Sequence, residues 1–294
     1  MGVFKAGFVN IVGNPNVGKS TLMNRLVGER ISIITAKAQT TRHRILGIVN
    51  TETMQIVYSD TPGALRPNYK LQESMLHFSE SAIDDADVLL YVTDVAEKTD
   101  KNEAFLLSVQ KAECPVLALI NKIDLSNQKD LEVLVAHWHA LLPKAEIYPI
   151  AAQTGFQIDV VRKRIEELIP PSPPYFDKDA LTDRPARFFV TEIIREKILL
   201  YYQKEIPYSV EVIVEQFEEG AKRIHIKSVI IVERDSQKGI LIGHRGQALK
   251  KVGMMARKDL ERFFDKKIFL EMYVKVESDW RNRDNILRRF GYSE

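Results

Sequence analysis

The chain has 294 residues, of which 45% are hydrophobic, and it contains one cysteine, so two ordinary domains fit and an intrinsically disordered or disulfide-stabilised protein is excluded. We find no signal-peptide layout and no run of about 18 apolar residues, and we expect a cytoplasmic protein. Residues 1–180 hold 19 Lys and Arg against 22 Asp and Glu (19 − 22 = −3), whereas residues 181–294 hold 23 against 18 (23 − 18 = +5), so a polyanionic partner is expected to meet the second part.

Short apolar runs alternate with longer mixed segments over the first 170 residues. Runs of this kind are typical of strands covered on both faces, and the segments between them, such as residues 20–27 and 130–142, have helical character. Two further runs, at 45–49 and 54–58, predict a hairpin that adds one antiparallel strand. We predict an α/β doubly wound domain with a mostly parallel sheet. The almost wholly apolar runs lie at residues 8–12, 88–94, 116–121 and 147–151.

A phosphate-binding motif follows the first apolar run. Its sequence GNPNVGKS matches G-x-x-x-x-G-K-[ST], whose backbone N–H groups surround phosphate oxygens at the N-terminus of a helix. Lys19 is expected to contact the β- and γ-phosphates, and the Ser20 hydroxyl to bind Mg²⁺. We assign nucleotide binding to Gly13, Asn14, Pro15, Asn16, Val17, Gly18, Lys19, Ser20 and Thr21.

A second motif, Asp60-Thr61-Pro62-Gly63, ends the run that starts at residue 54. An acid at a strand end can hold Mg²⁺, usually through water. The N–H group of Gly63 can bond the γ-phosphate, so the loop behind it senses that phosphate. Taken alone, these four residues are more typical of an ordinary turn.

Two later motifs predict a guanine site. In Asn121-Lys122-Ile123-Asp124, the aspartate can accept hydrogen bonds from N1–H and the 2-amino group of guanine, and Lys122 would lie along the base. Adenine has neither donor, so Asp124 would discriminate against it. After the last apolar run, a backbone N–H group of Ala151, Ala152 or Gln153 could bond guanine O6.

The sequence changes character after the proline run at residues 170–174. Prolines cannot continue a helix, so we expect an extended linker that reaches about residue 185. The order that follows is helix, strand, strand, short helix, glycine loop, helix and strand, which predicts a smaller α+β domain. The predicted divisions are a GTP-binding domain at 1–170, a linker at 171–185 and a second domain with a basic tail at 186–294.

The second glycine loop lies in the stretch GILIGHRGQALKK, and its element order matches the type II KH fold. Glycine has no Cβ, so a nucleic-acid backbone can approach closely. The alternative is a helix N-terminus with a solvated basic face, since residues 238–267 hold nine basic and three acidic residues. The basic and aromatic tail at 280–289 either holds RNA phosphates or docks onto the domain. The candidate RNA contacts are Ile242, Gly243, His244, Arg245, Gly246, Lys250 and Lys251.

The four nucleotide motifs, in their order and spacing, resemble those of the translation-factor-related GTPases. Four segments narrow the resemblance to the Era GTPases, and the match covers essentially the whole chain. One departure is Ala151, where the family usually has a serine; the loss of this hydroxyl is expected to loosen the base pocket slightly. The four segments are AQTTRHR at 38–44, TDRPARFF at 182–189, EIIREK at 192–197 and IGHRG at 242–246.

The resemblance implies a Mg²⁺-dependent, slow GTPase that acts as a switch. It also implies that the KH domain binds the 3′ end of small-subunit ribosomal RNA during assembly of the 30S subunit, and we expect a monomer. One of the threonines Thr40 and Thr41 is expected to close over Mg²⁺ when GTP is bound. The implied catalytic residues are Lys19, Thr40, Thr41, Asp60, Gly63 and Asn16, and the implied metal ligands are Ser20, Thr40, Thr41 and Asp60.

The residue that activates the attacking water is not evident. Many GTPases place a glutamine after the glycine of the second motif, but here Ala64 and Leu65 follow Gly63. Hydrolysis is then intrinsically slow, or a partner supplies a group, or a monovalent cation such as K⁺ assists with Asn16 as one ligand. We favour the cation, while Asn16 as a simple turn former is the alternative.

Two other functions fit the same sequence. One is an RNA chaperone that senses GTP occupancy while hydrolysis is incidental, which the missing glutamine supports. The other is a GTPase peripherally attached to the inner membrane through its basic face, although no long amphipathic anchor or lipidation motif is present.

Overall fold

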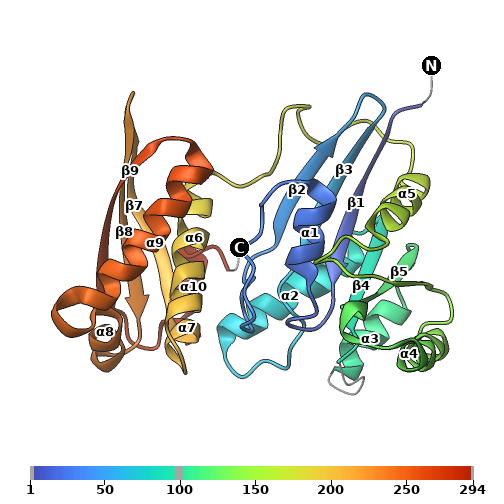
Figure 1. The fold of residues 1–294 in the computed structure, drawn as a ribbon, viewed down its shortest axis with the longest axis horizontal. Helices are drawn as coiled ribbons and strands as arrows, with labels where there is room; N and C mark the ends of the chain where they lie inside the picture. Colours follow the sequence, from blue (N-terminus) through green and yellow to red (C-terminus); the bar gives the residue numbers. More distant parts are fainter. Residues whose placement is uncertain (1–2, 97–101, 293–294) are drawn as a thin grey trace. The chain divides into compact units, whose positions relative to one another are not determined.

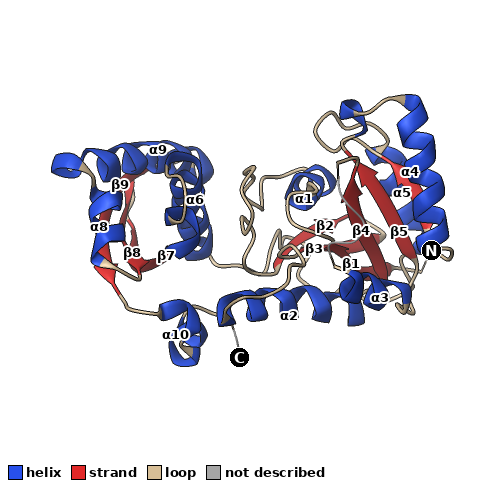
Figure 2. Cartoon of the chain, turned by 90° about the horizontal axis from the view of Figure 1, so that it is seen from below, coloured by secondary structure: helices blue, strands red, loops and turns tan. Residues whose placement is uncertain are grey.

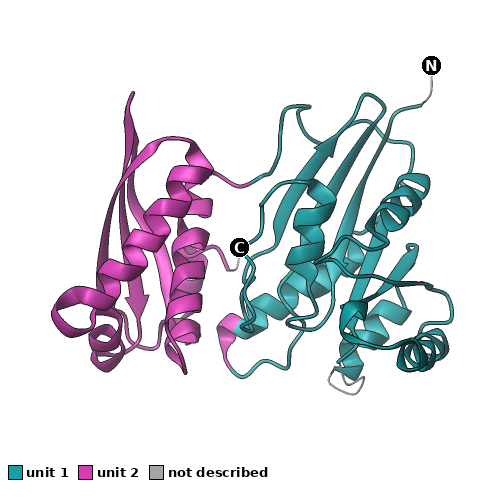
Figure 3. Ribbon diagram, in the orientation of Figure 1, with its two compact units in different colours: residues 1–68, 72–183 teal, residues 69–71, 184–294 magenta. Residues whose placement is uncertain are grey.

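The computed structural model describes residues 3–96 and 102–292. The chain divides into two units, residues 1–68 with 72–183, and residues 69–71 with 184–294 (Figure 3). The division between Asp183 and Arg184 falls within the segment predicted to be a linker. The two units are described separately below.

The first unit is built on a six-stranded sheet in the order β2-β3-β1-β4-β5-β6 (Figure 1). Only the β2–β3 pair is antiparallel, so the predicted doubly wound sheet with one antiparallel strand is confirmed. Every residue of β4 is buried, which explains why its run is wholly apolar up to Thr93. The strands are β1 (Lys5–Val12), β2 (Ile45–Asn50), β3 (Met54–Asp60), β4 (Val88–Asp94), β5 (Val116–Asn121) and β6 (Glu146–Pro149).

Helices cover both faces of this sheet. α1 (Lys19–Val27) and α5 (Ile158–Leu168) contact each other, and α1 packs on β1, β2 and β3. α2 (Lys70–Asp84), α3 (Glu103–Gln110) and α4 (Gln128–Leu141) contribute to a core that includes Phe105 and the buried Trp138. Figure 2 shows α1 and α2 on opposite sides of the sheet. Because β1, β3, β4, β5 and β6 run in the same direction, their carboxyl ends lie at one edge of the sheet, where the loops that follow them can form a binding site.

The predicted linker is bound to the first unit along residues 170–181, here called the strap. The strap begins beside β1, where the Ala6 N–H donates to the Pro170 carbonyl at 3.2 Å. It ends beside the edge strand β2, where the Ile48 N–H donates to the Leu181 carbonyl at 2.8 Å. Proline keeps the strap extended, as expected, but backbone pairing holds it in place.

The second unit has a three-stranded sheet, with β7 antiparallel to β8 and β8 parallel to β9. Alternate residues of β8 and β9 join a core with α6 and α9. The predicted element order is confirmed, and the structure adds one short helix, α7 (Ile206–Ser209). The remaining elements are α6 (Ala186–Tyr201), β7 (Glu211–Glu219), β8 (Arg223–Val232), α8 (Asp235–Ile242), α9 (Gln247–Phe264) and β9 (Lys267–Val276).

The C-terminal tail folds back onto the second unit through α10 (Asp284–Arg289) and a short 3₁₀ turn before it. The Trp280 side chain is fully buried and its Nε1–H donates to the Ser209 carbonyl at 3.1 Å. The Tyr292 hydroxyl donates to Glu211 Oε2 at 2.6 Å. Of the two roles considered for the tail, the structure shows docking. Across residues 3–96 and 102–292, every helix is too short or too polar to cross a bilayer.

Candidate functional site

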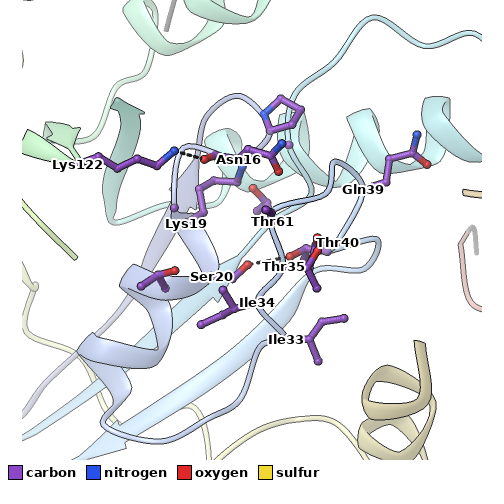
Figure 4. Close-up of a pocket in the computed structure, with 16 residues that line it drawn as sticks. Asn16, Lys19, Ser20, Ile33, Ile34, Thr35, Gln39, Thr40, Thr61 and Lys122 are labelled. Atoms are coloured by element: carbon purple, nitrogen blue, oxygen red, sulfur yellow. Dashed lines mark hydrogen bonds between the residues drawn. The ribbon is translucent and has the colours of Figure 1, made fainter. Parts of the chain in front are cut away.

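A cavity of about 380 Å³ lies in the first unit, beside the loop between β1 and α1 (Figure 4). It gathers residues from three predicted motifs and from residues 33–41. Pro15, Asn16, Gly18, Lys19, Ser20, Thr21, Thr40, Thr41, Thr61, Gly63 and Lys122 are predicted site residues that line it; Ile33, Ile34, Thr35, Ala36 and Gln39 line it too and were not predicted.

The phosphate-binding loop closes around a positive charge. Lys19 is buried, and its Nζ donates to the carbonyls of Gly13 at 3.0 Å and Asn14 at 2.8 Å. Gly18 caps α1 and supplies no side chain, so the first N–H groups of the helix are available to an anion. The loop therefore combines a helix N-terminus with a lysine ammonium, which suits phosphate.

Three oxygen atoms converge at the first turn of α1. Ser20 Oγ donates to Asp60 Oδ2 at 2.7 Å, Thr41 Oγ1 donates to the same atom at 3.3 Å, and the two hydroxyls are 2.9 Å apart. Asp60 is fully buried and, within the described residues, its Oδ1 has no hydrogen-bond partner. Burial raises the pKa of Asp60, while the Ser20 hydrogen bond and the Lys19 charge lower it. Hard oxygen donors beside an unsatisfied buried carboxylate oxygen fit Mg²⁺.

The neighbouring Thr40 points elsewhere. Its Oγ1 donates to the Lys37 carbonyl at 2.6 Å and lies 2.6 Å from Thr35 Oγ1. Gln39 has a φ of 58°, so the backbone turns immediately before the two threonines. This turn separates two hydroxyls that the sequence alone left equivalent.

The second motif approaches the phosphate-binding loop very closely at Gly63. A Cβ placed on Gly63 would lie 2.6 Å from Pro15 Cα, so no other residue fits there without a backbone shift. The next residue, Ala64, is buried in the core beneath α2 and α3, and its N–H donates to the Gly13 carbonyl at 3.1 Å. Its methyl group faces the protein interior, so the position after Gly63 offers no group to orient water.

The predicted base site lies beyond the cavity. Asn121 is buried, and its Nδ2 donates to the Val17 carbonyl at 2.8 Å while its Oδ1 accepts from the Ala152 N–H at 2.9 Å. It thereby joins the phosphate loop to the loop after β6. Asp124 is exposed in a 3₁₀ turn, where its carboxylate is open to a ligand.

Lys122 connects the phosphate-binding loop to the end of β4. Its Nζ donates to the Asn16 carbonyl at 2.6 Å and to Asp94 Oδ2 at 2.5 Å (Figure 4 shows the first contact). Asp94 itself accepts from the Ala96 N–H at 3.0 Å. Asp94 was not predicted, although an acidic residue at the end of a wholly buried strand was a signal for it.

Two adjacent residues of α1 hold loops on either side of the site, and neither was predicted. Asn24 Oδ1 accepts from the N–H groups of Ile31 and Ser32, both at 2.9 Å. Arg25 donates to two carbonyls of the loop that contains Ala151, Ala152 and Gln153. Both residues are ordinary in a helix sequence, and their role depends on tertiary contacts.

In the second unit, the candidate RNA loop joins α8 to α9. Gly243 has a φ of 70°, and an added Cβ would lie 2.6 Å from the Ala248 Cβ. Gly246 has a φ of 75°, but an added Cβ would meet no atom within 4 Å. His244 and Arg245, between them, are exposed, and Ile242 is half-buried before them. The loop thus presents open backbone and two basic side chains to solvent.

The start of α9 adds further positive charge to this loop. Lys250 and Lys251 are exposed, and the Lys251 ammonium lies 5.3 Å from the centroid of the Tyr201 ring. The neighbouring Tyr202 hydroxyl donates to the Leu241 carbonyl at 2.5 Å, which ties α6 to the end of α8. Burial raises the pKa of Tyr202, so its hydroxyl stays protonated as this donor.

Comparison with known proteins matches each unit to a family model. Residues 8–122 match a 50S ribosome-binding GTPase model, and residues 205–281 match a KH domain model. GTPase Era of Geotalea uraniireducens is 45% identical over 98% of this chain and 98% of its own length. GTPase Era of Carboxydothermus hydrogenoformans is 42% identical over 99% of both chains.

Two solved structures have the same fold over the whole chain. One is Era in complex with MgGDPNP and nucleotides 1506–1542 of 16S ribosomal RNA, and the other is an Aquifex aeolicus Era variant bound to GDP·AlF4⁻. Each is 38% identical, with a TM-score of 0.94, over 99% of this chain and 100% of its own. The chain belongs to the GTPase Era family, with an N-terminal GTPase domain followed by a C-terminal KH domain.

Proposed function

We propose that this chain is a GTP-hydrolysing switch that binds MgGTP and the 3′ end of small-subunit ribosomal RNA, and that it assists assembly of the 30S subunit. GTP would occupy the domain at 1–170, and RNA the domain at 186–294, with 171–185 between them. The relative bound to MgGDPNP and to nucleotides of 16S ribosomal RNA supports both ligands.

The observation that carries the nucleotide site is the convergence of Ser20, Thr41 and Asp60, with one Asp60 oxygen left unsatisfied. Mg²⁺, when bound, would neutralise the charge that develops on the phosphates. We propose that Ser20 and Thr41 contribute hydroxyl ligands, and that Asp60 holds the ion through its carboxylate. Lys19 would exchange its two carbonyl partners for phosphate oxygens, and Gly63 would bond the γ-phosphate.

The RNA assignment is tested by crosslinking in cells and sequencing of the bound RNA. Gly246→Asp is the better probe, because Gly243→Asp would also clash with Ala248. Aspartate tolerates a positive φ and places a carboxylate where a phosphate would pass. We expect crosslinks to small-subunit ribosomal RNA to fall roughly tenfold, the effect of about 1.4 kcal/mol.

Gly246→Asn is the matched control, since it has the same shape without the charge. Loss of crosslinks in both variants would show that the RNA backbone needs the space, and loss in the aspartate variant alone would show that charge decides. Crosslinks that persist in both variants would overturn the assignment.

We further propose that K⁺ assists hydrolysis, with Asn16 as one ligand. Asn16 lines the cavity and is exposed, and within the described residues its side-chain amide makes no hydrogen bond. The buried Ala64 leaves a need for such help. We expect GTP turnover to be several-fold faster in K⁺ than in Na⁺, and Asn16→Ala to remove that difference. Equal rates in all four conditions would refute the proposal.

Two alternatives remain testable. If the chain is an RNA chaperone that only senses GTP, Lys19→Ala would retain full function in cells. If the chain contacts the inner membrane peripherally, it would bind anionic vesicles in a salt-sensitive manner, and RNA would compete.

A further inference from the structure

The loop that follows β6 is closed by contacts of its first residue, since the Ala151 carbonyl accepts from the Gly155 N–H at 2.8 Å and from Thr154 Oγ1 at 3.3 Å, and the Ala151 N–H donates to the Phe156 carbonyl at 3.2 Å. Both Ala151 and Ala152 are buried, and neither side chain can form a hydrogen bond. The loop must nevertheless hold its backbone N–H groups in fixed directions if one of them is to bond guanine O6.

Arg25 supplies an anchor from outside the loop. Its Nε donates to the Ala152 carbonyl at 3.2 Å, and its Nη2 donates to the Gln153 carbonyl at 2.7 Å. The guanidinium is planar and rigid, so two donors of one group fix two consecutive carbonyls. Each peptide unit is planar and trans, so these contacts also fix the N–H groups of Gln153 and Thr154, which point the opposite way.

The fixed amides are free to meet a ligand. Within residues 3–96 and 102–292, the N–H groups of Gln153 and Thr154 make no hydrogen bond, whereas the Ala152 N–H is bound to Asn121 Oδ1. Asn121 and Arg25 therefore hold the loop from two sides. One contact comes from the strand that carries the guanine motif, and the other from the helix that begins at the phosphate loop.

Arg25 is itself held in place. It lies in α1, six residues after Lys19, and its carbonyl accepts from Arg162 Nη2 of α5 at 3.3 Å. A displacement of the loop relative to α1 would break both guanidinium contacts. The base end and the phosphate end of the site are thus linked through one short helix.

We infer that Arg25 is a positioning residue for guanine, which aligns the backbone N–H groups of Gln153 and Thr154 with O6. The inference rests on the proposed guanine site. It predicts that loss of Arg25 weakens the binding of only those nucleotides whose base carries an oxygen at position 6.

The test measures the dissociation constants of three nucleotides by calorimetry, for wild type and Arg25→Ala. GDP and inosine 5′-diphosphate both carry O6, and inosine lacks only the 2-amino group, which faces Asp124 in the proposed site. 2-Aminopurine riboside 5′-diphosphate lacks O6. We expect Arg25→Ala to raise the dissociation constants of GDP and inosine diphosphate roughly five- to tenfold, which corresponds to the loss of one hydrogen bond. The dissociation constant of the 2-aminopurine nucleotide should change by less than about twofold.

Arg164→Ala is the matched control, because Arg164 forms a bidentate contact with Glu146 on the same unit and does not contact the loop. It should leave all three constants unchanged, and Arg25→Lys, with one donor group, should give an intermediate loss. An equal loss for all three nucleotides would assign Arg25 to the fold or the phosphates and overturn the inference, as would no loss at all. If wild type itself binds GDP no better than the 2-aminopurine nucleotide, the proposed guanine site fails first.

Discussion

At the scale of single residues, the structure separates two threonines that are adjacent in the sequence. Thr41 contacts Asp60, whereas Thr40 bonds the backbone of Lys37. A hydroxyl that lies 2.9 Å from Ser20 is placed to share a metal ion with it. Thr41 is therefore the threonine that we expect to respond to the nucleotide.

The matched pair of variants Thr41→Ala and Thr40→Ala tests this assignment. We expect Thr41→Ala to lower GTP turnover roughly tenfold or more, because a group that supports transition-state charge is lost, and Thr40→Ala to stay within about twofold of wild type. GDP affinity should stay unchanged in both. The measurement is GTP turnover at several Mg²⁺ concentrations. A larger loss of turnover in Thr40→Ala than in Thr41→Ala would show that Thr40 is the ligand.

The sequence predicted the motif residues but not their neighbours. Lys19, Ser20 and Asp60 could be named because fixed spacing binds them to phosphate and Mg²⁺. Arg25 could not be assigned, because its contacts are with residues far away in the chain, whereas Asp94 carried a signal that was not used, as an acidic residue at the end of a buried strand. The choice between Thr40 and Thr41 depended on a local turn at Gln39, where the residue type permits several conformations.

At the scale of elements, the strap is the part of the chain whose structure departs most from its expected role as a linker. Gln55 of β3 is fully buried and binds it with both ends of its amide. Its Oε1 accepts from the N–H groups of Tyr175 at 2.7 Å and Phe176 at 3.0 Å, and its Nε2 donates to the Phe176 carbonyl at 2.8 Å. One side chain thus satisfies three backbone groups of the strap.

Gln55→Leu keeps the approximate volume and removes these hydrogen bonds. We expect the free energy of unfolding of the first domain to fall by about 1–3 kcal/mol, because buried backbone groups lose their partners. Amide exchange at Tyr175 and Phe176 should rise at the same time. Gln128→Leu, on exposed α4, is the control and should change neither quantity; unchanged exchange in Gln55→Leu would show that the strap does not depend on this residue.

The elements that the sequence predicted best are those with a clear period. The β9 strand and the α9 helix were identified by alternation and by an apolar stripe, because each buries one face. Proline marked the strap as extended, but its partners were not predictable. They include a glutamine side chain and the open edge of β2, and neither leaves a pattern in the sequence of the strap itself.

At the scale of the whole molecule, hydrogen bonds and the chain itself connect Thr41, a proposed Mg²⁺ ligand, to the start of the second unit. Thr41 precedes β2 by four residues, and Ile48 of β2 is hydrogen-bonded to Leu181 of the strap. Arg184, three residues later, is the first residue of the second unit's main segment. A displacement of β2 on GTP binding would therefore reach the start of the second unit through the strap.

Such a path predicts reciprocal coupling between the two ligands. If a GTP analogue raises the affinity for small-subunit ribosomal RNA by some factor, RNA must raise the affinity for the analogue by the same factor. A coupling free energy of 1–3 kcal/mol corresponds to a factor of about 5 to 150. We expect Gln55→Leu to reduce both factors equally while GDP affinity without RNA stays unchanged, because the strap is loosened and the nucleotide site is not. Titrations of each ligand with and without the other measure this. Affinities that do not respond to the other ligand in wild type would exclude coupling, and full coupling in Gln55→Leu would exclude this part of the strap as its route.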